Sequence, residues 1–578
     1  MGRHEKASGT DFFVRLNTAP RLSRWAFLCY NVLVRNEIKR IIGAVLKELG
    51  IAVGDVHLEH PEVSEHGDYA TNAALRYASE AGKGPRELAE ALAEGIRRAG
   101  DARIEKTEVD GPGFVNITLS QAFFDAALKE VLEKRDGYGK NEALAGKKII
   151  VEYTDPNPFK EFHIGHLMSN AIGESLSRLL EFSGAEVKRA CYQGDVGLHV
   201  AKALWGKREK PDAAWGEAYA HGAQNYEANK EAIDEINKKI YAQSDKEIMA
   251  LYEKGRQESL DYFESIYHDL GTRFDFYFFE SETGVFGKKV VEENTPAVFH
   301  ESDGATVFRG EEHGLHTRVF VTSQELPTYE AKELGLAKIK HDAYPYDESV
   351  VITGNEVRDY FKVVHKAMEF VFPELAAKTV HIPHGMLRLP SGKMSSRTGD
   401  VITAEALIDE AKKRILEKME DTALADKEQV AKEVAIGAVK YSILKNALGN
   451  DIIFEFDASL SFEGSSGPYL EYSYARARSV IAKARKSGVA PSLADVPAEK
   501  GRLERLVYQF PEVVSRAREE YAPQYVATYL IELAQAFNGF YAEEHIADSP
   551  YRLAQTEAVA IVLKNGLWLL GIPAPERM

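Results

Sequence analysis

The sequence predicts an α/β protein built around a doubly wound parallel sheet, with a small α+β unit before it and an all-helical region after it. The apolar run KKIIVEYT at residues 147–154 is typical of a buried strand, and the apolar residues beyond 164 recur at helical spacing. VKRACYQGD at 187–195 indicates a second strand. A strand, a crossover helix and a strand of these lengths favour a parallel pair, so we expect a Rossmann-like central domain.

The residues before this pair predict a small α+β unit. Two helix-like stretches bracket HGDYATNAALRYA, and the strand-like EVDGPGFVNITL follows them. We expect this N-terminal domain to span residues 33–121, after an extension of uncertain order at 1–32. The extension contains Glu5 and Asp11 and lacks a clean apolar core, which argues against a targeting segment.

The residues after the pair complete the central domain and add a helical one. Polar helical sequence at about 205–270 indicates an insertion, which we interpret as scaffold. Strand signals resume at RVFVTS (318–323) and DESVVITG (347–354), so we expect the central domain to span 122–403. Almost every segment from 404 to 578 is helix-like, which predicts a separate all-α domain.

Composition describes an ordinary globular chain of 578 residues, too long for one core. The two cysteines, Cys29 and Cys191, form no CxxC motif, so we expect neither a structural zinc nor a disulfide framework, and a cytoplasmic location. No apolar run reaches the roughly 20 residues that a membrane helix needs. The net charge of −17 does not exclude a nucleic-acid partner, because the placement of charge decides where a polyanion docks.

The stretch PNPFKEFHIGHLMSN places two histidines where the first strand gives way to a helix. Ligands of open α/β sheets bind beyond the carboxyl ends of strands, where a helix start offers free N–H groups. His163 and His166 could donate hydrogen bonds to phosphate oxygens there, and Gly165 lets a nucleotide approach the backbone. A nucleoside triphosphate fits this chemistry. Capping or surface histidines, and a metal site, are the alternatives.

A second signal is the glycine-flanked segment GKMSSRTGD at 392–400. Lys393 and Arg397 supply two permanent cations, and Ser395 and Ser396 supply two hydroxyls. Such a loop could close on the phosphates and stabilise a departing pyrophosphate; a solvated turn is the alternative. Neither a P-loop nor a GxGxxG fingerprint occurs elsewhere.

These two segments, read as HIGH and KMSSR, resemble the HIGH and KMSKS motifs of class I aminoacyl-tRNA synthetases. The segments EYTDPNPFKEFHIGH, YQGDVG, HGDYATNAALRYA, DGPGFVN and SSGPYLEYSYARAR resemble the arginyl-tRNA synthetase family, and the similarity covers about residues 33–578. The resemblance implies ligation of L-arginine to tRNA(Arg) through an arginyl-adenylate, with ATP and Mg²⁺ bound together. It also implies an N-terminal domain that contacts tRNA and a helical anticodon-binding domain. We expect a monomer.

The resemblance also implies roles for individual residues around the nucleotide. Glu152, Asn157, Tyr329 and Glu333 would meet arginine, although the family usually has an aspartate at the position of Glu333. A planar guanidinium presents five donors, so carboxylates and a phenol would reject lysine without a separate editing domain. The ATP-binding set would be His163, Gly165, His166, Gly354, Asn355, Lys393, Ser395 and Ser396.

The KMSSR variant departs from the family pattern, because Ser396 replaces a lysine credited with stabilising the transition state. Lys160 lies three residues before His163 and would supply the missing cation from the opposite side. We therefore predict a catalytic set of Lys160, His163, His166, Lys393 and Arg397.

Three segments are candidates for binding tRNA. Tyr474, Arg476 and Arg478 interleave an aromatic ring with cations, which suits base stacking and phosphate contacts. Core packing is the alternative for the aromatic members of the other two segments. Those segments contribute Tyr69 and Asn72 near the N-terminus, and Phe537, Asn538 and Tyr541 near the C-terminus.

Three other functions remain open from the sequence. A generic nucleotidyltransferase with the same Rossmann half would not explain the long helical C-terminal domain. Another class I synthetase, such as a cysteinyl enzyme, would need cysteine-rich zinc ligands, which this sequence lacks. A catalytically inactive tRNA-binding relative is opposed by the retained His163, Gly165, His166 and Lys393, while Ser396 keeps that alternative open.

Overall fold

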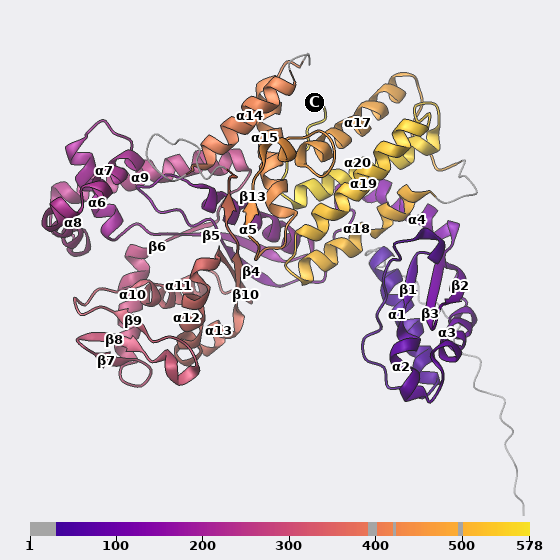
Figure 1. The fold of residues 1–578 in the computed structure, drawn as a ribbon, viewed down its shortest axis with the longest axis horizontal. Coiled ribbons are helices and arrows are strands. Elements are labelled where there is room, and N and C mark those ends of the chain that lie inside the picture. Colours follow the sequence, from indigo (N-terminus) through magenta and orange to yellow (C-terminus); the bar gives the residue numbers. More distant parts are fainter. Residues whose placement is uncertain (1–29, 391–401, 420–423, 495–500) are drawn as a thin grey trace, which may run out of the picture.

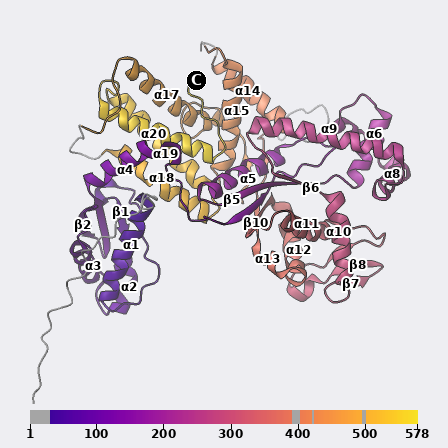
Figure 2. The ribbon, with the colours of Figure 1, turned by 180° about the vertical axis from the view of Figure 1, so that it is seen from behind.

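The computed structural model describes residues 30–390, 402–419, 424–494 and 501–578. Two predictions fall outside these residues: the extension up to residue 29, and the loop residues Lys393, Ser395, Ser396 and Arg397. Figures 1 and 2 show the N-terminal domain at one end of the molecule and the helices α6, α7 and α8 at the other, with the sheet and the C-terminal helices between them.

The central sheet confirms the predicted fold class. Its five strands are all parallel and lie in the order β11-β10-β4-β5-β6. The chain therefore winds outward in both directions from β4 and β10, and the carboxyl ends of these two neighbours form the switch point where α/β sheets bind ligands. The strands are β4 (Lys148–Glu152), β5 (Glu186–Gln193), β6 (Phe276–Phe279), β10 (Glu348–Gly354) and β11 (Thr379–His384).

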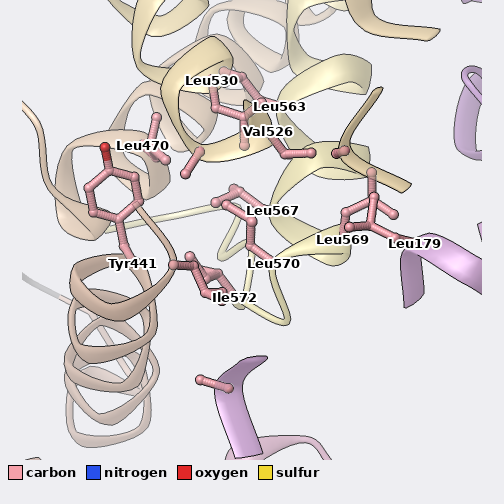
Figure 3. Packing of buried hydrophobic residues seen from close by; sticks show 14 of the residues in the cluster. Leu179, Tyr441, Leu470, Val526, Leu530, Leu563, Leu567, Leu569, Leu570 and Ile572 are labelled. Atoms are coloured by element: carbon pink, nitrogen blue, oxygen red, sulfur yellow. The ribbon is translucent and has the colours of Figure 1, made fainter. Parts of the chain in front are cut away.

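Helix α5 (Ile164–Phe182) is buried along almost its whole length, because the sheet lies on one side and C-terminal helices lie on the other. One hydrophobic core joins the two regions, and in it Leu179 of α5 lies near Leu569 at the end of the last helix (Figure 3). The hydroxyl of Ser175 also donates to the backbone carbonyl of Leu569 at 2.8 Å. The helix that starts with the two histidines is thus held by two domains.

A buried carboxylate fixes the middle of α5. Glu174 accepts from Arg178 at 2.7 Å, from Arg189 of β5 at 3.0 Å and from the hydroxyl of Tyr153 at 2.7 Å. Burial alone would raise the pKa of Glu174, but the two guanidinium groups lower that pKa to about 2. The guanidinium of Arg178 also donates hydrogen bonds to the backbone carbonyls of Trp568 and Gly271.

The helical insertion predicted at about 205–270 forms four helices with a core of their own. It is followed by α10 and a separate antiparallel sheet, β7-β8-β9, so the strand signal at RVFVTS belongs to this small sheet and not to the central one. The elements of this part are α6 (Leu198–Glu209), α7 (Trp215–Gln224), α8 (Lys230–Ala242), α9 (Lys246–Leu270), α10 (Glu280–Glu293), β7 (His300–Ser302), β8 (Ala305–Phe308), β9 (Arg318–Val321), α11 (Tyr329–Ala343), α12 (Arg358–Val371) and α13 (Pro373–Lys378).

The N-terminal domain packs three helices and a three-stranded antiparallel sheet around its own core. Its contact with the C-terminal helices combines apolar packing, in which Tyr508 of the C-terminal region enters the N-terminal core, with polar pairs. Arg35 and His60 contact the buried carboxylate of Glu512 at 3.1 and 3.2 Å, and Arg505 binds Asp68 at 2.9 Å. The elements are α1 (Tyr30–Glu48), β1 (Tyr69–Thr71), α2 (Ala73–Ala81), α3 (Pro85–Ala99), β2 (Ile104–Asp110), β3 (Phe114–Leu119) and the linking helix α4 (Gln121–Lys134).

In the part of the chain described after residue 404, the regular structure is helical apart from one short strand, β13 (Ile452–Ile453), which pairs with β12 (Leu387–Arg388). Among the described residues, no helix is both long enough and apolar enough to cross a membrane. The helices are α14 (Ala404–Lys418), α15 (Lys427–Leu444), α16 (Phe456–Ser459), α17 (Gly467–Lys486), α18 (Arg502–Glu519), α19 (Gln524–Glu543) and α20 (Pro550–Leu569).

We predict that Glu174→Ala lowers the free energy of unfolding by about 3–5 kcal/mol, because it removes the buried anion that Arg178 and Arg189 share and leaves Arg189 with only the part-exposed Glu181. Chemical denaturation followed by tryptophan fluorescence measures the change. The matched control is Lys188→Ala on the same strand as Arg189, which breaks a part-exposed pair with Asp275 and should cost less than about 1 kcal/mol. Equal losses in the two variants would contradict the role given to Glu174.

Candidate active site

The two histidines cap the start of α5 and also lock each other in place. Nδ1 of His163 accepts from the backbone N–H groups of Gly165 and His166 at 3.1 and 3.4 Å. Nδ1 of His166 accepts from the backbone N–H of His163 at 3.2 Å, and the two rings stack with their centroids 3.6 Å apart. The capping alternative is therefore correct for Nδ1, and it leaves Nε2 of each ring available for another role.

The protonation of this pair follows from its contacts. Burial lowers the pKa of His163 and lowers that of His166 well below its usual range, and the charge of nearby Lys160 acts in the same direction. A neutral imidazole whose Nδ1 accepts must carry its proton on Nε2. The site therefore holds two neutral rings, each with one N–H donor.

The chain returns to this helix start just after the glycine-flanked segment. The backbone N–H of Ile164 donates to the carbonyl of Ile402 at 3.1 Å, and that of Ala404 donates to the carbonyl of Phe162 at 2.9 Å. The first described residues after the KMSSR segment are thus paired with the residues that flank His163. The segment containing Lys393 and Arg397 itself lies outside the described residues.

The predicted arginine-binding carboxylates differ in their surroundings. Glu152, at the end of β4, is buried and forms an ion pair with Lys340 of α11 at 2.6 Å. Glu333 is half-buried and has no ion-pair partner among the described residues, and burial together with the charge of Glu152 raises the pKa of Glu333 to about 8. The structure therefore favours Glu333 over Glu152 as the carboxylate that is free to take a cation.

Asn157 and Tyr329 lie beside a second buried ion pair. The amide oxygen of Asn157 approaches Gly194 so closely that a side chain at Gly194 would overlap it, and Glu280 lies next to the same position. Glu280 pairs with Lys332, whose ammonium is 5.0 Å from the centre of the Tyr329 ring. Tyr329 is 60% exposed at the start of α11.

Sequence reasoning missed the lysines that neutralise this site. Lys332 and Lys340 are both buried on α11 and each is paired with a carboxylate from another element. The sequence offered no local signal for them, because α11 carries several other charged residues and the carboxylate partners lie 52 and 188 residues away.

Gly354 and Asn355 lie at the carboxyl end of β10, beside the strand that leads to the histidines. The adjacent Thr353 shares a 2.8 Å hydrogen bond with Nε2 of His381. The charge of Glu356 acts on His163, so this turn faces the start of α5. The turn therefore borders the same switch point.

No group of three or more side chains suited to binding a metal ion occurs among the described residues. The residues at the carboxyl edge of the sheet instead offer neutral N–H donors, paired carboxylates and Glu333, which has no ion-pair partner among the described residues. This set suits a ligand with phosphates at one end and a cation at the other.

Three of the predicted RNA contacts are wrong for this structure. Tyr69, Tyr474 and Phe537 are 0%, 3% and 0% exposed, so their rings pack in the core and offer no face to a base. The hydroxyl of Tyr69 donates to Glu512, which fixes it at the contact between domains.

The remaining RNA candidates occupy more open positions. Arg476 donates to Asn538 and lies over the exposed rings of Tyr472 and Tyr541, at 4.6 and 4.8 Å from their centres. Arg478 is paired with Glu576 at 3.1 Å. Asn72 is half-buried at the start of α2, where its side chain makes no capping hydrogen bond.

Comparison with known proteins now decides the family. Residues 127–456 match the model of the class I tRNA synthetase (R) catalytic domain, and residues 36–119 match that of the arginyl tRNA synthetase N terminal domain. Residues 470–578 match the DALR anticodon binding domain. The chain belongs to the arginyl-tRNA synthetase family. It is therefore a class I aminoacyl-tRNA synthetase by fold and by family, and an enzyme.

Relatives within this family match over nearly their full length. An arginine–tRNA ligase of Clostridium perfringens is 33% identical over 573 residues, which cover 95% of this chain and 100% of that protein. One from Streptococcus pneumoniae is 32% identical, over 94% of this chain and 99% of that protein. The Thermus thermophilus arginyl-tRNA synthetase structure matches with a TM-score of 0.77 and 26% identity, covering 94% of this chain and 100% of that one.

Proposed function

We propose that this chain joins L-arginine to tRNA(Arg), with ATP converted to AMP and pyrophosphate through an arginyl-adenylate. The observation that carries the proposal is the pair of neutral histidines at the start of α5, on the same sheet edge as the unpaired Glu333. The family membership supports the same reaction.

In the first step, a carboxylate oxygen of arginine bonds to the α-phosphorus of ATP and the bond to pyrophosphate breaks. Negative charge builds on the phosphate oxygens, and the Nε2–H groups of His163 and His166 are placed to donate to them. Because both rings are already fixed by backbone hydrogen bonds, they lose little freedom when they bind. Mg²⁺ would arrive with the ATP phosphates and neutralise part of their charge.

In the second step, a hydroxyl of the tRNA terminal ribose bonds to the adenylate carbonyl and AMP leaves. Neither step requires a covalent bond to the protein. Positioning and charge neutralisation by the residues around the switch point therefore account for the catalysis.

Recognition of the arginine side chain falls to Glu333 and Tyr329, on one helix. A guanidinium offers several N–H donors in one plane, so a carboxylate and a phenol can bind it together, whereas a lysine ammonium would leave one of them unpaired. Glu152 is held by its ion pair with Lys340, and its negative charge acts on Glu333. Asn157 lies at Gly194, next to Glu280.

Several finer predictions accompany this proposal. The N-terminal domain at 33–121 and the helical domain at 404–578 would contact tRNA, with the catalytic domain at 122–403 between them. Arg476, Asn538 and Tyr541 are the exposed or half-exposed candidates for that contact. A monomer and a cytoplasmic location also stay predictions.

The function is tested by ATP–pyrophosphate exchange with each of the 20 amino acids, with and without total tRNA. We expect exchange with arginine alone, appearing or rising sharply when tRNA is added, because bound RNA would complete the site. Exchange with another amino acid would overturn the arginine assignment. Absence of exchange under every condition would favour an inactive tRNA-binding relative.

Lys160→Gln should lower the rate of arginine-dependent exchange by about 100-fold, because it removes a cation placed beside His163. Lys238→Gln, an exposed lysine of α8, is the matched control and should exchange at the native rate. If the two variants behave alike, Lys160 does not stand in for the lysine that Ser396 replaces.

Arginine affinity should rise as the pH increases from 7 to 8.5, because Glu333 must be ionised to bind a cation and its pKa is about 8. Isothermal titration of arginine across this range, in buffers of different ionisation enthalpy, should also detect proton release. Glu333→Gln should weaken arginine binding about tenfold or more and abolish this pH dependence. The matched control is Glu325→Gln, at an exposed position, which should retain the pH dependence of arginine binding. If Glu333→Gln also retained that pH dependence, a group other than Glu333 would be the one that titrates.

A further inference from the structure

Lys440 of α15 is a buried lysine without a carboxylate partner. It is 0% exposed, and it forms no ion pair with any residue that the structure describes, whereas the buried Lys332 and Lys340 are each paired with a glutamate. Nζ of Lys440 instead donates to the backbone carbonyls of Leu270 and Gly571 at 2.6 and 2.7 Å. These carbonyls lie at the C-terminal ends of α9 and α20, so one side chain joins three helices from two domains.

The hydrogen bonds of Lys440 match the uncharged form of its side chain. A neutral amine has two N–H groups, and the two carbonyls satisfy both of them. An ammonium has three N–H groups, so its third one would be buried without an acceptor among the described residues. Gly571 has a φ of +64°, and a Cβ there would lie 3.1 Å from Nζ, so a glycine at this position lets the amine reach the carbonyl.

Two charged side chains of α5 face the same point. A Cβ at Gly571 would lie 3.6 Å from Cγ of Glu174 and 3.9 Å from the guanidinium carbon of Arg178. Burial and the charge of Arg178 lower the pKa of Lys440, the charge of Glu174 opposes them, and the result is a pKa of about 7. Glu174 stays ionised throughout the neutral range because its own pKa is about 2.

Other ionisable groups on neighbouring helices differ in position or in sign. On α17, the buried carboxyl of Glu471 lies against Gly437, three residues before Lys440 along α15. Burial raises the pKa of Glu471 well above its usual range, so exposure to water would release a proton from this group, whereas exposure of Lys440 would take one up. On α9, Asp269 is paired with Lys432 of α15 at 2.6 Å, nearer the surface.

We propose that Lys440 forms a proton-linked latch between the helical C-terminal domain and α5, which closes around the uncharged amine and takes up a proton when it opens. This inference goes beyond the proposed function and does not depend on the substrate. Because the closed form binds fewer protons than the hydrated form, the stabilisation is fully present above the ordinary lysine pKa of about 10.4 and falls as the pH drops towards 7. The ends of α9 and α20 are therefore held less tightly at pH 7 than at pH 9.

The test measures amide hydrogen exchange by mass spectrometry in the native protein at pH 7 and pH 9, with correction for the intrinsic exchange rate at each pH. The segments to follow are 264–271 and 566–572, at the ends of α9 and α20. Opening should be about 50-fold more frequent at pH 7 than at pH 9, because the pKa of the amine returns from about 7 to its ordinary value on hydration. Equal protection at the two pH values, or greater protection at pH 7, would overturn the proposal.

A pair of variants assigns the proton to Lys440. Lys440→Met keeps the length and apolar volume of the side chain but does not titrate, so the pH dependence of both segments should disappear. The matched control Lys432→Met removes an ion pair between the same two helices, α15 and α9, and should keep the pH dependence. Thermal unfolding checks that each variant is folded, and the measurement on the native protein decides the matter if Lys440→Met is not. Retention of the full pH dependence in folded Lys440→Met would assign the proton to another group and end the proposal.

Discussion

The structure depends on the burial of α5 between the central sheet and the C-terminal helices. If the two histidines act on ATP as proposed, the first turn of α5 must keep a fixed position relative to the ends of β4 and β10. Here α5 is packed on both sides along its length. Leu179 and Ser175 contact the end of α20, while Glu174 binds Arg189 of the sheet. Movement of the C-terminal helices would therefore reach the start of α5 through packed side chains and not through a flexible linker.

Buried charges on α11 set the electrostatics of the candidate site. Lys332 and Lys340 offset the carboxylates of Glu280 and Glu152, so two negative charges that would repel each other are held in the interior. Glu333, on the same helix, has no ion-pair partner among the described residues, and burial together with the charge of Glu152 raises its pKa to about 8. A guanidinium would complete the arrangement by supplying the missing positive charge. The glutamate that stands where the family usually has an aspartate is thus compatible with a cation site.

Contacts between domains are made by charged and polar groups as well as by apolar packing. Glu512 on α18 binds Arg35, His60 and Tyr69 of the N-terminal domain, and it is almost fully buried. Lys440 on α15 is fully buried and donates to the carbonyls of Leu270 and Gly571, at the ends of α9 and α20. Removing one partner of such a contact is costly, because the partner that remains would be a buried group without its hydrogen-bond or ionic partner. They favour a single arrangement of the surfaces that would face tRNA.

The sequence by itself determined the parallel sheet, the helical C-terminal domain, the position of the histidines and the family, because these follow from local periodicity and short motifs. It did not determine which candidate side chains are available. Tyr69 and Glu512 are 443 residues apart, and Glu152 and Lys340 are 188 apart, so only the folded chain shows that Tyr69 is buried and that Glu152 is already paired. The same holds for Tyr474 and Phe537, whose aromatic rings suit either RNA or a core. Burial and ion pairing depend on partners that are distant in the sequence, and tertiary structure alone brings those partners together.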